Sequence, residues 1–255
     1  MRVGCGWRLA AGAVGLLGVS APCSAAGVVS LNLCSDQLLV LLAPERVAAL
    51  EPLARDPAIS FVAAQAARLP SVRADAEAVV SLHPDLVLAG RYGAQTTVAL
   101  LRAHGLRVVQ IEEPQSFAAI GAEVMRLAAL LGVPARGQAL VAGMWRRLEA
   151  VQRRRGTAMI WGANGWTAGR GSLGDAVLRA AGFTDAGTGG QIGLEALLTH
   201  PPDLLVTETA PAFPSMATDL ARLPVLAGMA RRQVPPALMI CGGPFTAGAV
   251  EMVAR

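Results

Sequence analysis

One pattern occurs twice in this chain and constrains its fold more than any other feature. Residues 74–88 read ADAEAVVSLHPDLVL and residues 192–206 read IGLEALLTHPPDLLV, with eight residues from the glutamate to the aspartate in each copy. Each copy is typical of a short helix that a proline ends, followed by an aspartate that opens a buried strand. The repetition predicts two units with related local topology. A chain of 255 residues is long enough for two such lobes of about 100 residues, with a cleft between them.

Short apolar runs alternate with segments of helical spacing through both halves of the chain. Expected strands cover residues 28–33, 85–89, 107–111, 158–161, 203–206 and a last one around 237–240. One expected helix follows Ser35 or Asp36 as the capping residue, and others cover about 96–104, 173–181 and 194–198. Alternating strands and helices are typical of parallel sheets. The fold class is therefore α/β, with two Rossmann-like lobes.

A helical stretch separates the two halves. Apolar residues recur at helical spacing from Phe117 to Arg155, and only Gly132-Val133-Pro134 interrupts them. A helix from 134 to 155 would be about 33 Å long, enough to run the height of a lobe. We therefore expect an N-terminal lobe over 27–133, one long rigid linking helix over 134–155, a C-terminal lobe over 156–255, and a ligand cleft between the lobes.

The first 26 residues are typical of a secretion signal. Arg2 and Arg8 precede and border an apolar run over 9–19, and Ser24-Ala25-Ala26 supplies the small residues that a signal peptidase recognises. The run is shorter than the about 18 residues of a membrane span. A lipid anchor on Cys23 is the less favoured alternative, because Pro22 stands where a lipobox needs a small residue. We predict a secreted, soluble mature protein.

The charge of the chain gives no support to nucleic-acid binding. All 22 basic residues are arginines, and without residues 1–26 the balance is 20 arginines against 18 acidic residues. Arginines at 146–147 and 153–155 cluster near the end of the expected linking helix. Because cations complement the negative end of a helix dipole, we interpret this cluster as a contribution to helix stability and solubility.

Ligands of open α/β sheets bind beyond the carboxyl ends of the strands. Only 4% of the residues are aromatic, yet several of them lie at or near these ends, which favours a flat, partly apolar ligand. The aromatic rings have an alternative role, which is packing in the core or between the lobes, and core packing is the favoured interpretation for Trp161. Arginines in these loops have the alternative of simple exposure to solvent. The expected ligand-binding residues are Asn32, Cys34, Ser35, Asp36, Arg91, Tyr92, Asn164, Trp166, Arg170, Cys241 and Phe245.

Cys34 and Cys241 remain once the first 26 residues are removed, and each follows an expected strand of a different lobe. Three outcomes are open. A disulfide would fasten the lobes together, free thiols would contact a soft metal centre, and buried thiols would serve as apolar filler.

Enzymatic chemistry and direct metal binding find little support. Residues 169–174 match G-x-G-x-x-G before an expected helix, the one hint of an exported dinucleotide-dependent enzyme, but the preceding strand ends too early for the fingerprint. No G-x-S-x-G is present, and His83, His104 and His200 have no metal-ligand spacing. We expect no enzyme activity, no cofactor and no bare metal ion, so any metal arrives already chelated.

The segments VVSLNLCSDQLLVLL, LPSVRADAEAVVSLHPDLVLAG, IGLEALLTHPPDLLV and LMICGGPFTAGAVEMV, with the long middle helix, resemble periplasmic substrate-binding proteins of ABC importers for cobalamin, ferric siderophores and haem. The resemblance covers essentially the whole chain after residue 26. It implies two lobes bridged by a helix, which bind a bulky metal chelate and deliver it to a permease. Cobalamin or a ferric siderophore is the expected ligand.

The resemblance also implies permease docking through one surface glutamate on each lobe, and the matching positions are Glu77 and Glu195. The alternative for these residues is an ordinary solvated helix face. We expect a monomer that contacts the membrane only through the permease. Storage or chaperoning of a chelate is the alternative function that the sequence leaves open.

Overall fold

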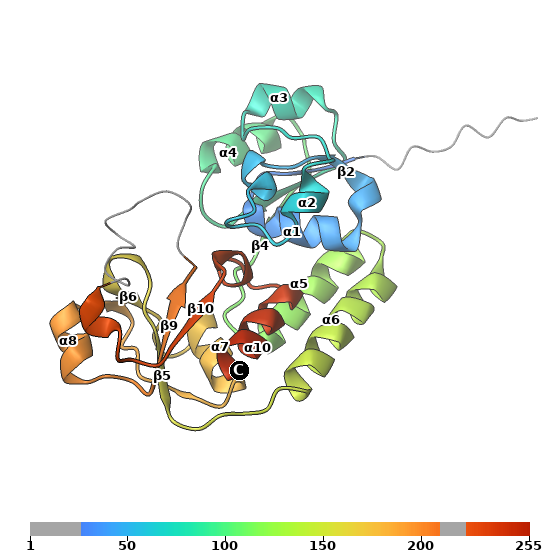
Figure 1. The fold of residues 1–255 in the computed structure, drawn as a ribbon. Helices are drawn as coiled ribbons and strands as arrows, with labels where there is room; N and C mark the ends of the chain where they lie inside the picture. Colours follow the sequence, from blue (N-terminus) through green and yellow to red (C-terminus); the bar gives the residue numbers. More distant parts are fainter. Residues whose placement is uncertain (1–26, 210–222) are drawn as a thin grey trace, which may run out of the picture.

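The computed structural model describes residues 27–209 and 223–255. The predicted signal peptide, residues 1–26, lies outside the described residues. Within them the chain forms two α/β lobes and a group of helices that joins them, as Figure 1 shows. No helix in the described ranges is long and apolar enough to span a membrane.

The N-terminal lobe is built on a four-stranded parallel sheet with the order β2-β1-β3-β4. Its strands are β1 (Val28–Ser30), β2 (Val47–Ala49), β3 (Leu86–Gly90) and β4 (Val108–Ile111). Its helices are α1 (Leu33–Leu42), α2 (Ala63–Ala66), α3 (Ala76–Ser81) and α4 (Gln95–Ala103). Side chains alternate across the sheet: Val28 packs into the large core around α1 and α5, whereas Val29 faces Val79 of α3 and Leu101 of α4.

The C-terminal lobe has a second parallel sheet with the order β10-β9-β5-β7. Its strands are β5 (Thr157–Ile160), β7 (Thr184–Asp185), β9 (Leu204–Glu208) and β10 (Arg231–Val234). A short antiparallel pair, β6 (Trp166–Thr167) and β8 (Gly190–Gln191), lies beside it. The helices are α7 (Leu173–Ala180), α8 (Leu194–Thr199) and α10 (Ala247–Ala254).

The predicted repeat is confirmed. In both sheets the first strand lies between the second and the third, so β1, β3 and β4 correspond to β5, β9 and β10. The repeated segment forms α3 and β3 in one lobe and α8 and β9 in the other. Val79 and Leu197 are the fully buried residues at equivalent positions of the two helices. The duplicated spacing therefore places one helix–strand unit in each half.

The predicted helical stretch forms α5 (Phe117–Leu130) and α6 (Pro134–Glu149), which pack against each other, and Gly132 adopts a φ of 74° at the predicted break. The linking helix is shorter than predicted, since α6 ends at Glu149 rather than Arg155. Beyond it the backbone N–H of Arg154 donates to Ala181 O at 2.8 Å, and Gly156 has a φ of 118°. These contacts fix residues 151–156 outside the helix, which leaves α6 about 24 Å long.

The last predicted strand is wrong. Residues 236–238 form a single 3₁₀ turn, and the strand is β10, over Arg231–Val234. Three of its four residues are exposed and polar, as an edge strand allows, so it has no apolar run to identify it. Pro235 and Pro236 prevent the more apolar segment that follows from joining the sheet.

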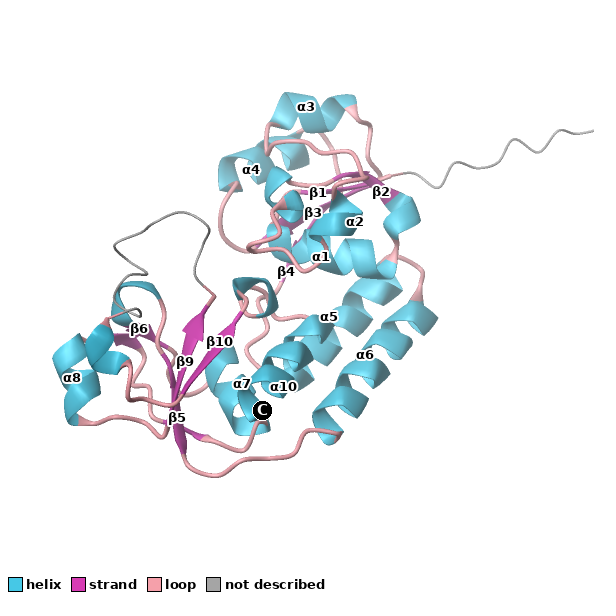
Figure 2. Cartoon of the chain, in the orientation of Figure 1, coloured by secondary structure: helices cyan, strands magenta, loops and turns pink. Residues whose placement is uncertain are grey.

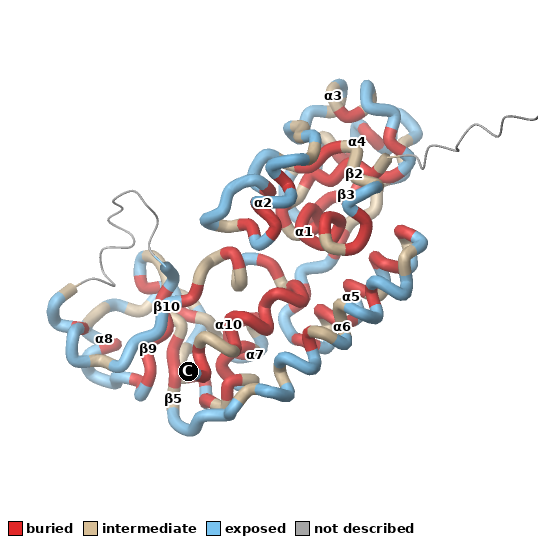
Figure 3. The backbone as a smooth tube through the Cα atoms, turned by 45° about the vertical axis from the view of Figure 1, so that its right-hand side comes forward, coloured by how far each residue is buried: buried red, intermediate tan, exposed pale blue. Residues whose placement is uncertain are grey.

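One hydrophobic core extends from the N-terminal lobe through the joining helices into the C-terminal lobe. It includes Leu39 of α1, Val124 of α5, Met144 of α6, Val177 of α7 and Val250 of α10. Figure 2 shows α10 lying alongside α5 and α6, and the buried segments of Figure 3 run through both lobes and these helices. The continuous core fixes the lobes to each other.

Candidate functional site

The carboxyl ends of the two sheets approach each other between the lobes. Cys34, just after β1, is bonded to Cys241, which follows β10, with a Cα–Cα distance of 5.3 Å. Gln115, after β4, accepts the N–H of Leu173 at the start of α7 with its Oε1 at 3.0 Å. In Figure 2, β9 and β10 point toward the N-terminal lobe. We call the loops at these strand ends the inter-lobe edge.

The disulfide lies in a small apolar cluster at one side of this edge. Cys241 and Phe245 are buried together with Leu33, and the Phe61 ring stacks on Phe245 with a centroid distance of 4.9 Å. Of the three outcomes open for the cysteines, the structure has the disulfide. Only 3% of Phe245 is exposed, so its ring packs between the lobes in this structure.

Polar residues after β1 hold the strand–helix turn. The Asn32 side chain accepts the N–H groups of Cys34 and Ser35, at 2.9 and 3.3 Å, and so caps α1. The predicted cap, Ser35 or Asp36, is wrong, because both lie inside the helix. Ser35 is fully buried, with its Oγ 2.7 Å from that of Ser30. These side chains are engaged within the N-terminal lobe.

Asp36 is a fully buried carboxyl beneath this turn. One oxygen accepts the N–H of Glu51 at 3.4 Å, and the other has no partner among the described residues. Burial raises the pKa of Asp36 well above its ordinary value, although the nearby polar groups of Ser30 and of the Glu51 backbone oppose the shift. Desolvation also raises the pKa of Glu51. Burial therefore disfavours the charged form of Asp36 relative to its form in water.

Arg91 and Tyr92 follow β3. Arg91 Nη1 lies 3.0 Å from Glu112 Oε2 in an exposed ion pair that connects the loops after β3 and β4. Gln95 Nε2 donates to the carbonyls of Arg91 and Gly93, both at 3.0 Å, and holds the turn. Tyr92 projects from this turn with 69% of its surface exposed.

Asn164 and Trp166 lie in the loop after β5, the first strand of the C-terminal sheet. Asn164 and Gly165 have positive φ values of 54° and 77°, and Gly162 N–H donates to Trp166 O at 2.7 Å. This tight turn leaves Asn164 exposed and 59% of Trp166 exposed. Trp161, as expected, is buried in the core. Tyr92 and Trp166 are the two most exposed aromatic side chains among the described residues.

Sequence reasoning missed Glu51, after β2, and Glu208, at the end of β9. Desolvation raises the pKa of both carboxyls. The sequence contained a signal for both residues, because each glutamate follows an apolar run at the carboxyl end of a strand. Among the described residues, no group of three or more His, Cys, Asp and Glu side chains is arranged to hold a metal ion.

The G-x-G-x-x-G segment does not present free N–H groups in the way a pyrophosphate site needs. Gly171 N–H donates to Asp175 Oδ2 at 3.0 Å, and Asp175 N–H donates to Ser172 Oγ at 3.1 Å. Leu173 N–H is taken by Gln115. Gly174, the last residue of this segment, lies where a Cβ would collide with Ala168. Arg170, from the same segment, lines a separate pocket beside α7 and β7.

Glu77 and Glu195 lie at equivalent positions of the repeat. Each is the exposed second residue of a six-residue helix, Glu77 in α3 and Glu195 in α8. In the described part of the chain neither forms a salt bridge. The two helices lie on the outer sides of their lobes in Figure 1.

Comparison with known sequences identifies one family. The profile of the family described as "Periplasmic binding protein" matches residues 28–230, most of the chain. No curated protein sequence matches the chain significantly.

The fold is similar to that of solved binding proteins. The periplasmic heme-binding protein HutB of Vibrio cholerae is 15% identical, with a TM-score of 0.75 over 91% of this chain and 98% of that one. A periplasmic heme-binding protein of Pseudomonas aeruginosa is 24% identical, with a TM-score of 0.67 over 88% and 91%. The vitamin B12-binding protein BtuF of Vibrio cholerae is 19% identical, with a TM-score of 0.63 over 89% and 94%.

Proposed function

The chain belongs to the periplasmic binding protein family, and from this premise we propose that it is the substrate-binding component of an ABC importer. It captures a metal chelate between its lobes and delivers it to the permease. The ligand class is that of cobalamin, ferric siderophores and haem. The protein acts by binding, and no covalent step is part of the proposal.

The observation that carries this proposal is the pair of exposed aromatic rings on the inter-lobe edge. Tyr92 comes from the loop after β3 and Trp166 from the loop after β5, so each lobe contributes one ring. Exposed rings on loops at the carboxyl ends of strands in both sheets favour a large flat ligand that stacks on them. The structures with similar folds include proteins that bind heme and vitamin B12, which are ligands of this shape.

The joining core and the disulfide favour a site that is largely formed before the ligand arrives. The core is continuous from α1 to α10, and the Cys34–Cys241 bond connects the lobes directly. A preformed site costs little reorganisation on binding. We therefore expect little change in the radius of gyration by solution scattering when the ligand binds, and a large compaction would contradict this.

Delivery rather than storage is favoured by Glu77 and Glu195. Their equivalent places in the repeat put one exposed carboxylate on each lobe, at positions suited to two-point pairing with arginines of a permease. Charge reversal of both glutamates should leave chelate affinity unchanged and abolish uptake. Uptake that persists in the double variant would leave storage as the better account.

The direct test is a titration of residues 27–255 with cyanocobalamin, haemin and ferrichrome, followed by absorption and tryptophan fluorescence. At least one chelate should bind and quench the fluorescence. Tyr92→Ala and Trp166→Ala should each weaken binding about tenfold, which corresponds to about 1.4 kcal/mol of lost contact.

Trp145→Ala is the matched control, because Trp145 is also exposed, at 40%, but lies on α6. It should leave the affinity unchanged. The proposal fails if none of the three chelates binds, or if Trp145→Ala weakens binding as much as Trp166→Ala does.

A further inference from the structure

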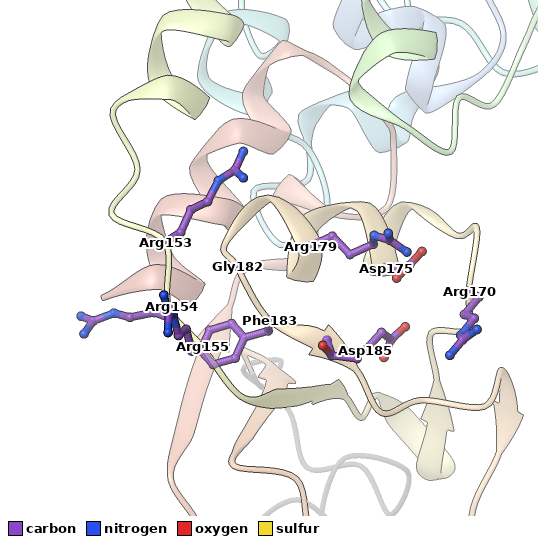
Figure 4. A pocket seen from close by; sticks show the side chains of 10 residues that line it. Arg153, Arg154, Arg155, Arg170, Asp175, Arg179, Gly182, Phe183 and Asp185 are labelled. Carbon is purple, nitrogen blue, oxygen red and sulfur yellow. The ribbon is translucent and has the colours of Figure 1, made fainter.

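A pocket lies beside the open edge of the C-terminal sheet, where β7 is the last strand. Four segments line it: residues 153–155 after α6, Arg170 before α7, Asp175 and Arg179 of α7, and residues 182–185, which lead into and form β7. Its volume is about 800 Å³. Figure 4 shows Arg154 and Arg155 beside Phe183 at one end, Arg170 at the other, and Asp185 between them. We call this the arginine pocket.

The arginine pocket concentrates positive charge in a chain that is almost neutral elsewhere. Five arginines and two aspartates line it, a surplus of three positive charges. The chain after residue 26 has 20 arginines against 18 acidic residues. The remainder of the chain therefore carries slightly more negative than positive charge, and the surplus belongs to this one place.

Most of these arginines have no partner in the described part of the chain. Arg154 donates to the backbone oxygens of Ala254 and Arg255, each at 2.6 Å. The guanidinium groups of Arg153, Arg155 and Arg179 make no hydrogen bond or salt bridge there. Elsewhere four arginines pair with glutamates: Arg91, Arg126, Arg136 and Arg147. Grouping unpaired like charges is unfavourable unless an anion joins them.

Asp185 supplies a second, independent feature of the pocket. Only 9% of it is exposed; Oδ1 accepts the N–H of Gly187 at 2.8 Å, and Oδ2 has no partner among the described residues. It also lines an adjoining cavity of about 660 Å³ between residues 169–172 and 185–189. A carboxyl group that lines the pocket between cationic groups, and whose hydrogen-bonding capacity is not fully used, is suited to accept a hydrogen bond from a ligand hydroxyl.

We propose that the arginine pocket binds a multivalent phosphate whose carbon skeleton carries hydroxyl groups. Arginines bind phosphate oxygens through pairs of N–H donors, and the volume exceeds what a single phosphate fills. The Asp185 carboxylate, which lines the pocket, accepts a hydroxyl of the same ligand. A soluble sugar phosphate and a phosphorylated inositol headgroup of a lipid share this chemistry. The inference does not rest on the proposed transport function, because most of the lining residues, at 153–155 and 179–183, precede β5 and β7 and so lie at the opposite ends of these strands from the inter-lobe edge.

The test is calorimetric titration of residues 27–255 at physiological salt with glucose 1,6-bisphosphate and with tripolyphosphate, which has no hydroxyl groups. The double variant Arg155→Gln/Arg179→Gln should bind both at least about tenfold more weakly. The double variant Arg68→Gln/Arg102→Gln removes the same charge from exposed sites on the other lobe and should change binding by less than about twofold. Both should keep the thermal midpoint and the chelate affinity of the parent.

Asp185→Asn separates the two parts of the proposal. It should weaken binding of glucose 1,6-bisphosphate and leave tripolyphosphate binding equal or stronger, because a negative charge is removed. Co-sedimentation with phosphatidylcholine vesicles, with and without phosphatidylinositol 4-phosphate, tells a lipid source from a soluble one. The proposal is overturned if neither soluble probe binds, if the two double variants behave alike, or if Asp185→Asn weakens both probes equally.

Discussion

The two lobes share one sheet order but connect their first strand to the following helix in different ways. In the N-terminal lobe two residues separate β1 from α1, and Asn32, Ser30 and Ser35 fix that turn with hydrogen bonds. In the C-terminal lobe residues 161–172 separate β5 from α7, and they include β6 and the exposed Trp166. The first connection is closed and mostly buried, whereas the second is an open loop.

The two connections therefore differ in how much sequence change they tolerate. A buried polar turn tolerates little change, because each lost partner leaves an unsatisfied group in the interior. An exposed loop on a rigid sheet can change its side chains at small cost to stability. Under the proposed function we therefore expect the N-terminal edge to act as a fixed wall of the ligand site, and the C-terminal loop to set the ligand preference.

The largest effect is expected from the Cys34–Cys241 disulfide, which connects the loop after β1 to the C-terminal lobe. Cys34→Ala/Cys241→Ala removes a cross-link between residues 207 apart in sequence, and it should lower the free energy of unfolding by about 2–5 kcal/mol. Urea denaturation measures the change. The parent protein in excess dithiothreitol is the control and should behave like the double variant; equal midpoints with and without reductant would contradict the prediction.

Two glycines at similar φ compare the loops of the two lobes. Gly93, after β3, has a φ of 76° and open space around it, whereas a Cβ on Gly165, after β5, would collide with the carbonyl oxygen of Ile192. Gly93→Ala should cost about 1 kcal/mol of stability from backbone strain. Gly165→Ala should cost about 1–3 kcal/mol more. Thermal unfolding of both variants measures the difference. Similar midpoints would show that the turn at Gly165 accommodates a Cβ as easily as the turn at Gly93 does.

The buried carboxyl of Asp36, beneath the turn after β1, should make the stability of the protein depend on pH. Because burial raises the folded-state pKa of Asp36, the unfolded chain releases this proton first, and stability falls as the pH rises from about 4 toward the folded pKa. Asp36→Asn should flatten that decline in urea midpoints measured between acid and neutral pH. Asp85→Asn, at an exposed aspartate of the same lobe, should leave the profile unchanged.

The smallest effect is expected at the repeated aspartate. Asp203 Oδ2 accepts the N–H and the hydroxyl of Thr157, at 2.7 and 2.9 Å, and these bonds lower its pKa. Its stabilisation is therefore present above the unfolded pKa and is lost as the pH falls through the folded one. Asp203→Asn should lower the neutral-pH urea midpoint slightly, and Asp85→Asn should not, because the Asp85 side chain has no such bond in the described part of the chain. Equal changes in the urea midpoint for the two variants would contradict the prediction, because they would show that Asp85 makes a stabilising contact equivalent to that of Asp203.

The prediction of the site was less complete than that of the fold, and particular residues show why. Trp166 and Tyr92 were correctly placed in loops at strand ends, because periodicity locates those ends. Asn32 is a predicted ligand residue, and the structure shows that its side-chain oxygen caps α1; the same short amide serves either purpose, and the sequence does not show which partner lies nearby. Arg153 and Arg155 were assigned to a helix end, but α6 stops before them and they join Arg170 and Arg179 in one pocket.

The sequence by itself determined the two α/β units, the corresponding places of Glu77 and Glu195, and the helix break at 132–134. All of these depend on local patterns of apolar spacing, proline and glycine, which act within a few residues. Only the tertiary structure decided that Cys34 meets Cys241, that Asp36 and Asp185 are buried, and that the arginines gather beside β7. Those outcomes depend on contacts between residues far apart in the chain, and burial and charge acquire their energies only when such contacts form.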